Sequence, residues 1–260
     1  MRGHPVTTEA VQTPAPTRRE RQREATLDEI VSVSRELVKE PGRLSLRAVA
    51  QQVGMTAPAL YRYVSNYQEL VELVAYDIDL DATKTLAKAR DSQPDDDPAA
   101  QIICAAIAFR RWALGDKEEF SLVFANPVTA SSCNRREGIN QSPTGLLFTE
   151  LLGKLWMKYQ FPIPSLDDLE PAVAEALLDP AIPADPSAFP EEARGLLWIF
   201  MRSWATLYGT VTLEVFGHLD PNIIESGAMF RAMLEEQAAL LGITDEMPRL
   251  RPFIAQEMRQ

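Results

Sequence analysis

One stretch of the sequence, Ser45 to Val64, carries hydroxyl, phenol and guanidinium groups at the spacing of a helix surface. Leu60 and Val64 lie four residues apart, so they would share the buried face of that helix. The residues around them would face outward: Thr56, Ala57, Pro58, Ala59, Tyr61, Arg62 and Tyr63. Phenol, hydroxyl and guanidinium groups can hydrogen-bond phosphate oxygens and base edges, and a plain core helix would not expose two tyrosines. The pattern therefore favours a surface that contacts a DNA duplex.

A second short helix is expected just before this one. Its apolar residues recur at i, i+3, i+4 and i+7, at Leu46, Val49, Ala50 and Val53, and Ser45 is placed to cap its first turn. Gly54 follows, where a helix end tolerates positive φ, and Thr56 can cap a new helix whose first turn still permits Pro58. A turn of about three residues between two short helices is the arrangement of a helix-turn-helix.

At these residues the chain resembles the tetracycline-repressor (TetR) family of bacterial transcription regulators. The family's pattern appears as Gly42, then SLRAVA from Ser45, GMT from Gly54 and LYRYV from Leu60. Two positions depart from the pattern: Tyr63 replaces the usual His, and Tyr67 stands where a phosphate-binding Lys is common. The resemblance implies phosphate contacts from Arg47, Tyr61, Tyr63 and Tyr67, and base-edge contacts from Thr56, Ala57, Pro58, Ala59 and Arg62.

The head that carries this motif is expected to span residues 18–66, after a disordered tail over residues 1–17. Its first helix has capping-box spacing at both Thr17/Glu20 and Thr26/Glu29, so it can begin at either place. Four arginines precede or open this helix: Arg18, Arg19, Arg21 and Arg23. They are either an arm that reaches phosphates or a solvated helix start with interleaved Glu residues.

The rest of the chain is expected to be a larger helical body over residues 67–243, followed by a tail over residues 244–260. Helical periods or caps occur at 66–86, 97–113, 115–126, 143–159, 192–218 and 220–241, and LEPAVAEALL from Leu169 can hold a helix inside the proline-rich stretch 161–192. No segment shows a sustained strand alternation flanked by hairpin turns. We therefore predict an all-α fold of about nine to ten helices.

Charge is distributed unevenly between the two parts. The net charge is −11, but residues 1–65 hold ten Lys/Arg against seven Asp/Glu, and the remainder holds sixteen against thirty. Phosphate would attract the basic head and repel the acidic body, so the molecule should dock on DNA by one end.

No apolar run is long enough for a membrane span and no secretion signal is recognised, which predicts a cytoplasmic protein. Cys104 and Cys133 suit reduced thiols rather than a metal site or a disulfide.

A dimer is expected through the last two long helices. The segment Trp204 to Gly217 resembles the Trp…His-Gly motif of one C-terminal subfamily, with Tyr208 at the His position. In the family these helices pair with their counterparts in a second subunit. The apolar stripes that would form the seam are Leu207, Val211 and Val215 on one helix and Phe230 and Leu234 on the other. Such stripes can equally belong to an internal core; we favour the seam because a monomer would read only half a site.

The same resemblance places an effector pocket among the helices of the body. The candidate lining residues are Phe109, Trp112, Phe124, Phe148, Trp156 and Trp204, with Phe120 and Trp198 on the same helices. Aromatic residues at helical spacing serve packing more often than a ligand cage, so the alternative is an ordinary core. Arg110 or Arg111 would need an anionic or carbonyl partner if it pointed inward; a surface salt bridge or a snorkelling side chain is the simpler interpretation.

Together with the motif, the resemblance implies a homodimeric repressor that small-molecule binding releases from a palindromic operator in double-stranded DNA, with half-sites roughly 34 Å or a multiple apart. No cofactor or metal is expected. An enzyme is disfavoured because His4 and His218 cannot form a pair and no phosphate-binding glycine loop is present. The alternative is a small-molecule-binding or partner protein on the same fold that does not read DNA, which Tyr67 and the acidic total leave open.

Overall fold

The structure is a computed structural model that describes residues 17–126, 142–178 and 189–259. Across these ranges the regular elements are all helical, which confirms the predicted all-α class. The described residues hold twelve α-helices, more than the nine to ten expected, because several are short and separated by tight turns. Residues 1–16 of the tail expected over 1–17 lie outside the described residues, as does Cys133, whereas Thr17 caps the first helix.

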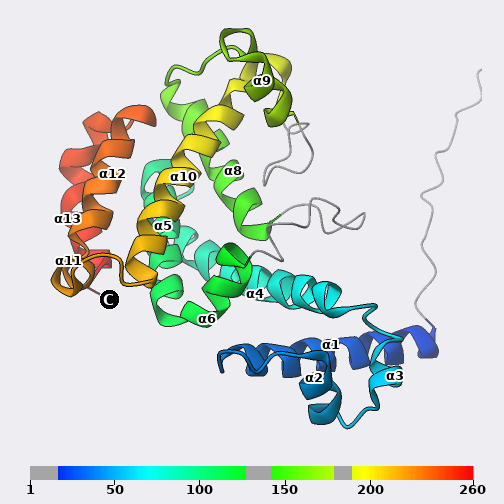
Figure 1. Cartoon of the computed structure of the whole chain (residues 1–260). Coiled ribbons are helices and arrows are strands. Elements are labelled where there is room, and N and C mark those ends of the chain that lie inside the picture. The colour runs from blue at the N-terminus through cyan, green and yellow to red at the C-terminus, as the bar shows by residue number, and fades with distance from the viewer. Residues whose placement is uncertain (1–16, 127–141, 179–188, 260) are drawn as a thin grey trace, which may run out of the picture.

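The head consists of α1 (Arg18–Val38), α2 (Leu46–Gln52) and α3 (Ala57–Leu60), at the lower right of Figure 1. The first helix begins at the earlier of the two possible caps, because the Thr17 hydroxyl accepts from Glu20 N and the Glu20 carboxylate accepts from Thr17 N. Ser45 caps α2 as expected, its Oγ accepting from Ala48 N at 3.2 Å. The buried side chains of the three helices form one core with the start of the next helix.

Helix α4 (Tyr67–Arg90) joins the head to the body. It begins after Asn66, whose side chain accepts from Glu69 N at 2.9 Å, in agreement with the helix predicted from residue 66. Its N-terminal half packs into the head through buried residues that include Leu70 and Val74, and Leu86 near its C-terminus belongs to the core of the body. A single rigid helix therefore has one end in each core.

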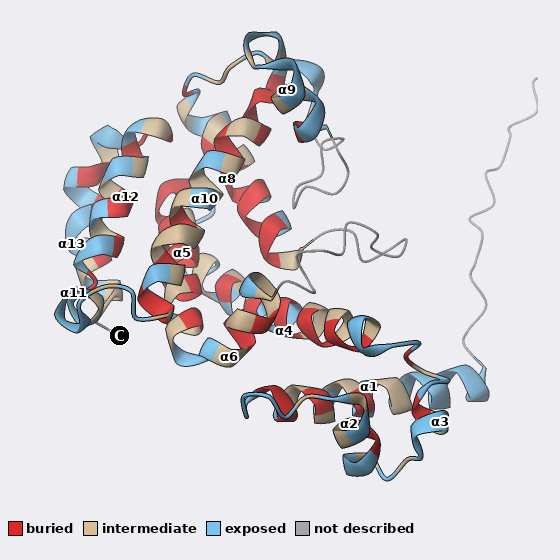
Figure 2. Ribbon diagram, viewed as in Figure 1, coloured by how far each residue is buried: buried red, intermediate tan, exposed pale blue. Residues whose placement is uncertain are grey.

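The body is built around α5 (Pro98–Gly115), which is buried along most of its length (Figure 2). Around it lie α6 (Lys117–Phe120), the π-helical turn η1 (Ser121–Ala125), α8 (Pro143–Tyr159) and α10 (Gly195–Val215). Helix α9 (Pro171–Leu177) lies beyond the end of α8, between the short 3₁₀ turns η2 (Leu166–Asp168) and η4 (Glu191–Ala193) in the chain. It falls inside the segment for which a helix was suggested.

The C-terminal part differs from expectation in two ways. The helix expected over 220–241 is interrupted, because Gly227 adopts φ 63° and separates α11 (Pro221–Ser226) from α12 (Ala228–Leu240). The residues expected as a tail form the 3₁₀ turn η5 (Thr244–Glu246) and α13 (Met247–Glu257). Met247, Leu250 and Ile254 share one face of α13 and are buried against the body, so this segment belongs to the fold. Within the described ranges no helix is long and apolar enough to cross a membrane.

Candidate functional site

Helix α3 and the turn that follows it present small and polar side chains to solvent and apolar side chains to the core. Leu60 and Val64 are 1% and 0% exposed, whereas Tyr61 is 53% exposed. The other residues assigned to this surface are exposed at Thr56, Ala57, Pro58 and Arg62 and half-buried at Ala59 and Tyr63. The two buried anchors therefore fix the orientation of a helix whose remaining side chains are free to meet a ligand surface.

The hydroxyl of Thr56 is not used to cap α3. The Thr56 carbonyl accepts from Ala59 N at 2.9 Å and from Leu60 N at 3.1 Å, but its side chain makes no capping hydrogen bond. The third helical N–H, which the cap side chains of α1, α2 and α4 accept from, belongs here to Ala59 and is bonded to the Thr56 carbonyl instead. The sequence expectation of a side-chain cap is therefore wrong, and the hydroxyl stays at the exposed start of the helix.

The remaining predicted phosphate contacts lie around α3. Arg47 on α2 is exposed, and Tyr67 at the start of α4 is 40% exposed. The Arg23 guanidinium carbon lies 5.7 Å from the centroid of the Tyr63 ring, a cation–π contact that packs the first helix against the end of the third. The four N-terminal arginines lie on the exposed first turns of α1, so they form a helix start rather than an extended arm.

Most of the candidate aromatic residues form one packed cluster, and two of its members also line a cavity. The Phe109 ring is fully buried, and its centroid lies 5.5–6.3 Å from those of five other rings, which belong to Trp112, Phe120, Phe124, Phe148 and Trp204. Trp156 lies elsewhere and donates its Nε1 hydrogen to Phe161 O at 3.1 Å. Phe109, Trp112, Phe124 and Trp156 do not line the apolar cavity between α10 and α12, and their rings pack against one another or bond to the backbone. A role for them in ligand binding stays a prediction.

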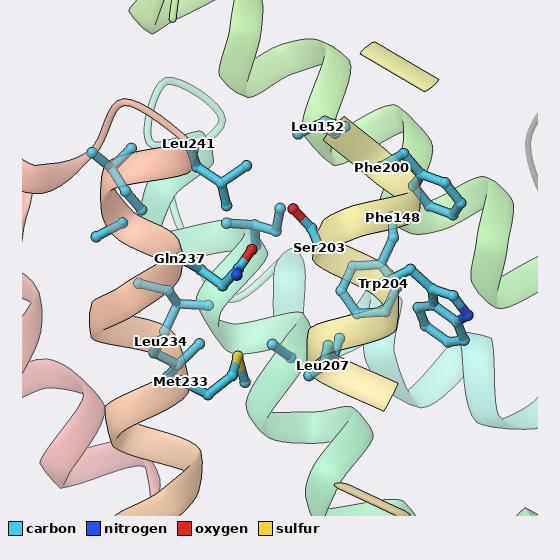
Figure 3. Close-up of a pocket in the computed structure, with 15 residues that line it drawn as sticks. Phe148, Leu152, Phe200, Ser203, Trp204, Leu207, Met233, Leu234, Gln237 and Leu241 are labelled. Carbon is cyan, nitrogen blue, oxygen red and sulfur yellow. The ribbon is translucent and has the colours of Figure 1, made fainter. Parts of the chain in front are cut away.

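Phe148 and Trp204 do line a cavity, which has a volume of about 70 Å³. It lies between α10 and α12, with α5 and α8 completing the wall (Figure 3). The lining is apolar apart from Ser203 and Gln237, and also includes Ile102, Ile103, Ala106, Leu152, Phe200, Leu207, Met233, Leu234, Ala238, Leu241 and Ile243. Sequence reasoning missed Ser203 and Gln237, although a polar residue on the buried face of an apolar helix was a usable signal.

The residues predicted to form the dimer seam are interior residues of the single chain. Val211 and Phe230 are 0% exposed, and the other three, Leu207, Val215 and Leu234, are no more than 9% exposed. All five belong to the core of the body. The seam was assigned to the wrong faces because a helical stripe shows that a face is buried but not what buries it.

Arg110 points inward and finds its anion within the chain. Its Nε donates to Glu214 Oε2 at 2.6 Å and its Nη2 to Ile224 O at 2.7 Å. Burial raises the pKa of Glu214, and the ion pair with Arg110 opposes that shift. Arg111 is exposed and donates to Glu257 O at 2.7 Å. Neither arginine lines the cavity, and Arg110 requires no anionic ligand.

An ion-pair network joins the head to the body. Arg35 of α1 donates from Nε and Nη2 to both carboxylate oxygens of Glu119 on α6, at 2.6 and 3.0 Å. Its Nη1 also donates to Asp81 at 2.9 Å and to Asp77 at 3.3 Å on α4. Glu119 is 4% exposed, so the pair is well shielded, and its hydrogen bond is the main reason that the pKa of Arg35 is raised. No local pattern indicates this contact, because the two residues are 84 positions apart in the chain.

Comparison with known proteins connects these features to a family. The family described as "Tetracyclin repressor-like, C-terminal domain" matches residues 102–237. The HTH-type transcriptional regulators Rv1816 of Mycobacterium tuberculosis and Mb1846 of Mycobacterium bovis are each 29% identical over 217 residues, which is 82% of this chain and 90% of theirs. A solved structure of the regulatory protein SCO4313 superposes with a TM-score of 0.57 at 26% identity, covering 87% of this chain and 100% of that one.

The family match covers the helices that form the cavity and the aromatic cluster, and the mycobacterial relatives align over most of the chain. Together with the helix-turn-helix in the head, they account for both parts of the molecule. The chain belongs to the TetR family of transcription regulators.

Proposed function

We propose that the chain is a homodimeric repressor that binds a palindromic operator through α3 and leaves it when a small molecule occupies the body. The observation that carries the proposal is the orientation of α3, in which buried Leu60 and Val64 hold Tyr61 and Arg62 in solvent. An exposed helix with small residues at its start can enter a major groove, where base edges are distinguishable.

The proposed contacts follow from the position of each side chain. Thr56, Ala57, Pro58, Ala59 and Arg62 would approach base edges, and Arg47, Tyr61, Tyr63 and Tyr67 would meet phosphates. The excess of positive charge in the head supports docking by this end, since the acidic body is repelled by phosphate. Tyr67 offers phosphate a neutral hydroxyl where a Lys would offer a charged ammonium, so the non-specific electrostatic attraction to DNA is weaker than with Lys.

A dimer is needed because one head covers only half of a palindrome. Since the inward faces of α10 and α12 are occupied by the chain's own core, we place the seam on their outward faces. Exposed apolar side chains in this region support that placement, with Leu213 and Met229 each 41% exposed and Ile223 of α11 37% exposed. Burial of such residues against a second copy would remove apolar area from water.

The Arg35–Glu119 pair supports a route from the body to the head. Glu119 precedes Phe120 of the aromatic cluster, and that cluster also contains Trp204 of the cavity wall. A molecule that shifts Trp204 would therefore disturb the element that holds α1. Linkage requires the effect to be reciprocal, so operator binding should weaken effector binding by the same factor.

Selection of bound duplexes from fragmented genomic DNA, using the full-length protein, tests the proposal. We expect an enriched palindrome whose half-site centres lie about 34 Å, or a multiple of that distance, apart. Light scattering of the free protein should give the mass of two chains. An empty selection would contradict the proposal and favour a small-molecule-binding or partner protein on the same fold; an asymmetric consensus bound by one chain would contradict the dimer.

A further inference from the structure

The cavity between α10 and α12 contains two polar atoms that the fold itself leaves without partners. Ser203 Oγ and Gln237 Oε1 are both shielded from solvent and make no hydrogen bond to the described residues. The two side chains come from opposite walls and point toward each other across the cavity (Figure 3). Buried polar groups in folded proteins are nearly always paired, so an unpaired couple facing one space indicates a missing partner.

We propose that this cavity binds an uncharged amphipathic molecule, whose single hydrogen-bonding group sits between Ser203 and Gln237 and whose hydrocarbon part lies against the apolar wall. This inference rests on the proposed function in one respect only, namely that the bound molecule is the effector. A hydroxyl on the ligand can donate to Gln237 Oε1 and accept from Ser203 Oγ, so one group satisfies both atoms.

The lining excludes a charged head group. Among the described residues that form the cavity there is no Lys, Arg, His, Asp or Glu. A carboxylate or ammonium placed there would lose its hydration without gaining a counter-ion, which makes its burial unfavourable. The inward-pointing Arg110 does not change this, because its guanidinium is already bound to Glu214 and to Ile224 O.

The size of the cavity and the ends of α12 bear on how a ligand enters. A volume of about 70 Å³ exceeds what one water needs but is small for a drug-sized ligand.

Gly227 and Gly242, with φ of 63° and 66°, lie just before and just after α12. The helix is thus bounded by two residues that tolerate backbone changes, and its outward displacement from α10 would enlarge the cavity. If the dimer seam lies on the outer faces of these helices, such a displacement would also change the dimer.

Three probes with the same six-carbon chain test the chemistry: 1-hexanol, hexane and hexanoate. Binding is measured on the full-length protein without DNA, by calorimetry and by the ligand-dependent rise in Tm. We expect the alcohol to bind more tightly than either of the other two. Equal binding of 1-hexanol and hexanoate, or tighter binding of hexanoate, would overturn the proposal, as would no binding of 1-hexanol.

Two substitutions remove the polar atoms, and two matched substitutions serve as controls. Ser203→Ala and Gln237→Leu should each weaken 1-hexanol binding about fivefold to tenfold, the effect of one net hydrogen bond, while Gln237→Leu binds hexane at least as well as the unmodified chain. Two controls should leave both affinities unchanged: Thr206→Val, where the native hydroxyl donates to Arg202 O of its own helix, and Gln256→Leu, at an exposed position of α13.

The Tm of the ligand-free variants separates a binding role from a structural role. Because the two polar atoms are unpaired in the free protein, Ser203→Ala and Gln237→Leu should hold or raise the Tm. A marked fall in Tm would show that these atoms support the fold and would overturn the inference. Addition of 1-hexanol to an operator complex then tests the effector role alone: binding without release contradicts the proposed regulation and leaves the binding site intact.

Discussion

Removing the phenol hydroxyl of Tyr61 should weaken operator binding and leave the fold unchanged. The side chain is 53% exposed, so Tyr61→Phe should alter the free energy of unfolding by less than about 0.5 kcal/mol. A hydrogen bond to a charged phosphate oxygen contributes about 1.5 kcal/mol or more, and a dimer makes two. The expected loss is about 3 kcal/mol, or about 100-fold in the dissociation constant, measured by a salt-controlled gel shift on the selected operator. The salt dependence should not change, since the phenol carries no charge.

Two further variants make this result specific. Tyr76→Phe carries the same chemical change on α4, away from α3, and should bind the operator like the unmodified chain. Arg47→Gln removes a charge instead, so its affinity should fall together with the steepness of the salt dependence. If Tyr61→Phe bound within twofold of the unmodified chain, the contact assigned to this phenol would be refuted. An equal loss in Tyr76→Phe would place the cause in the position of the head rather than in a phosphate contact.

Three other predictions concern the body and its connection to the head. Glu119→Gln should destabilise the chain by about 1–3 kcal/mol in chemical denaturation and reduce the effector-dependent release of DNA, because Arg35 loses a buried charged partner. Gly242→Ala should lower the Tm more than Gly217→Ala, because both glycines have positive φ, 66° and 67°, but only at Gly242 would the added Cβ lie 2.8 Å from Phe161 Cβ. In a Cys133→Ser background, Cys104 should resist a thiol reagent at pH 8 until the chain is unfolded. Burial raises its pKa to about 11, so roughly one thiol in a thousand is ionised at that pH.

The parts of the fold that the sequence predicted correctly depend on local interactions. Ser45 and Asn66 each accept a hydrogen bond from the backbone N–H three residues later in the chain. The four-residue spacing of Leu60 and Val64 already predicts that both lie on the buried side. Such signals lie within one helical turn, so no knowledge of the tertiary structure is needed to read them. Thr56 is the exception: it has the residue type and position of a cap, but the Ala59 N–H bonds to its carbonyl rather than to its hydroxyl.

The parts that could not be predicted depend on contacts between distant segments. The stripe at Val211 and the ring of Phe230 had the pattern of a buried face, but only the packing of α10 on α12 shows that the partner is the same chain. The final helix was missed because its pattern is short and two prolines interrupt it. That Ser203 and Gln237 lie in the same cavity also could not be predicted, because two helices distant in the sequence bring them together.

The two cores of the molecule meet at a short segment whose residues alternate between them. Phe120 belongs to the core of the body, Leu122 to the core of the head, and Phe124 packs again against the body. In a helical segment residues four positions apart share a face and the residue midway between them points to the other side, so Phe120 and Phe124 reach the body while Leu122 reaches the head. Glu119, on α6 two residues before the π-helical turn η1, accepts a hydrogen bond from Arg35 of α1. A movement of the cavity wall that displaces the aromatic cluster therefore has to deform this turn, and the deformation reaches the head through both an apolar and an ionic contact.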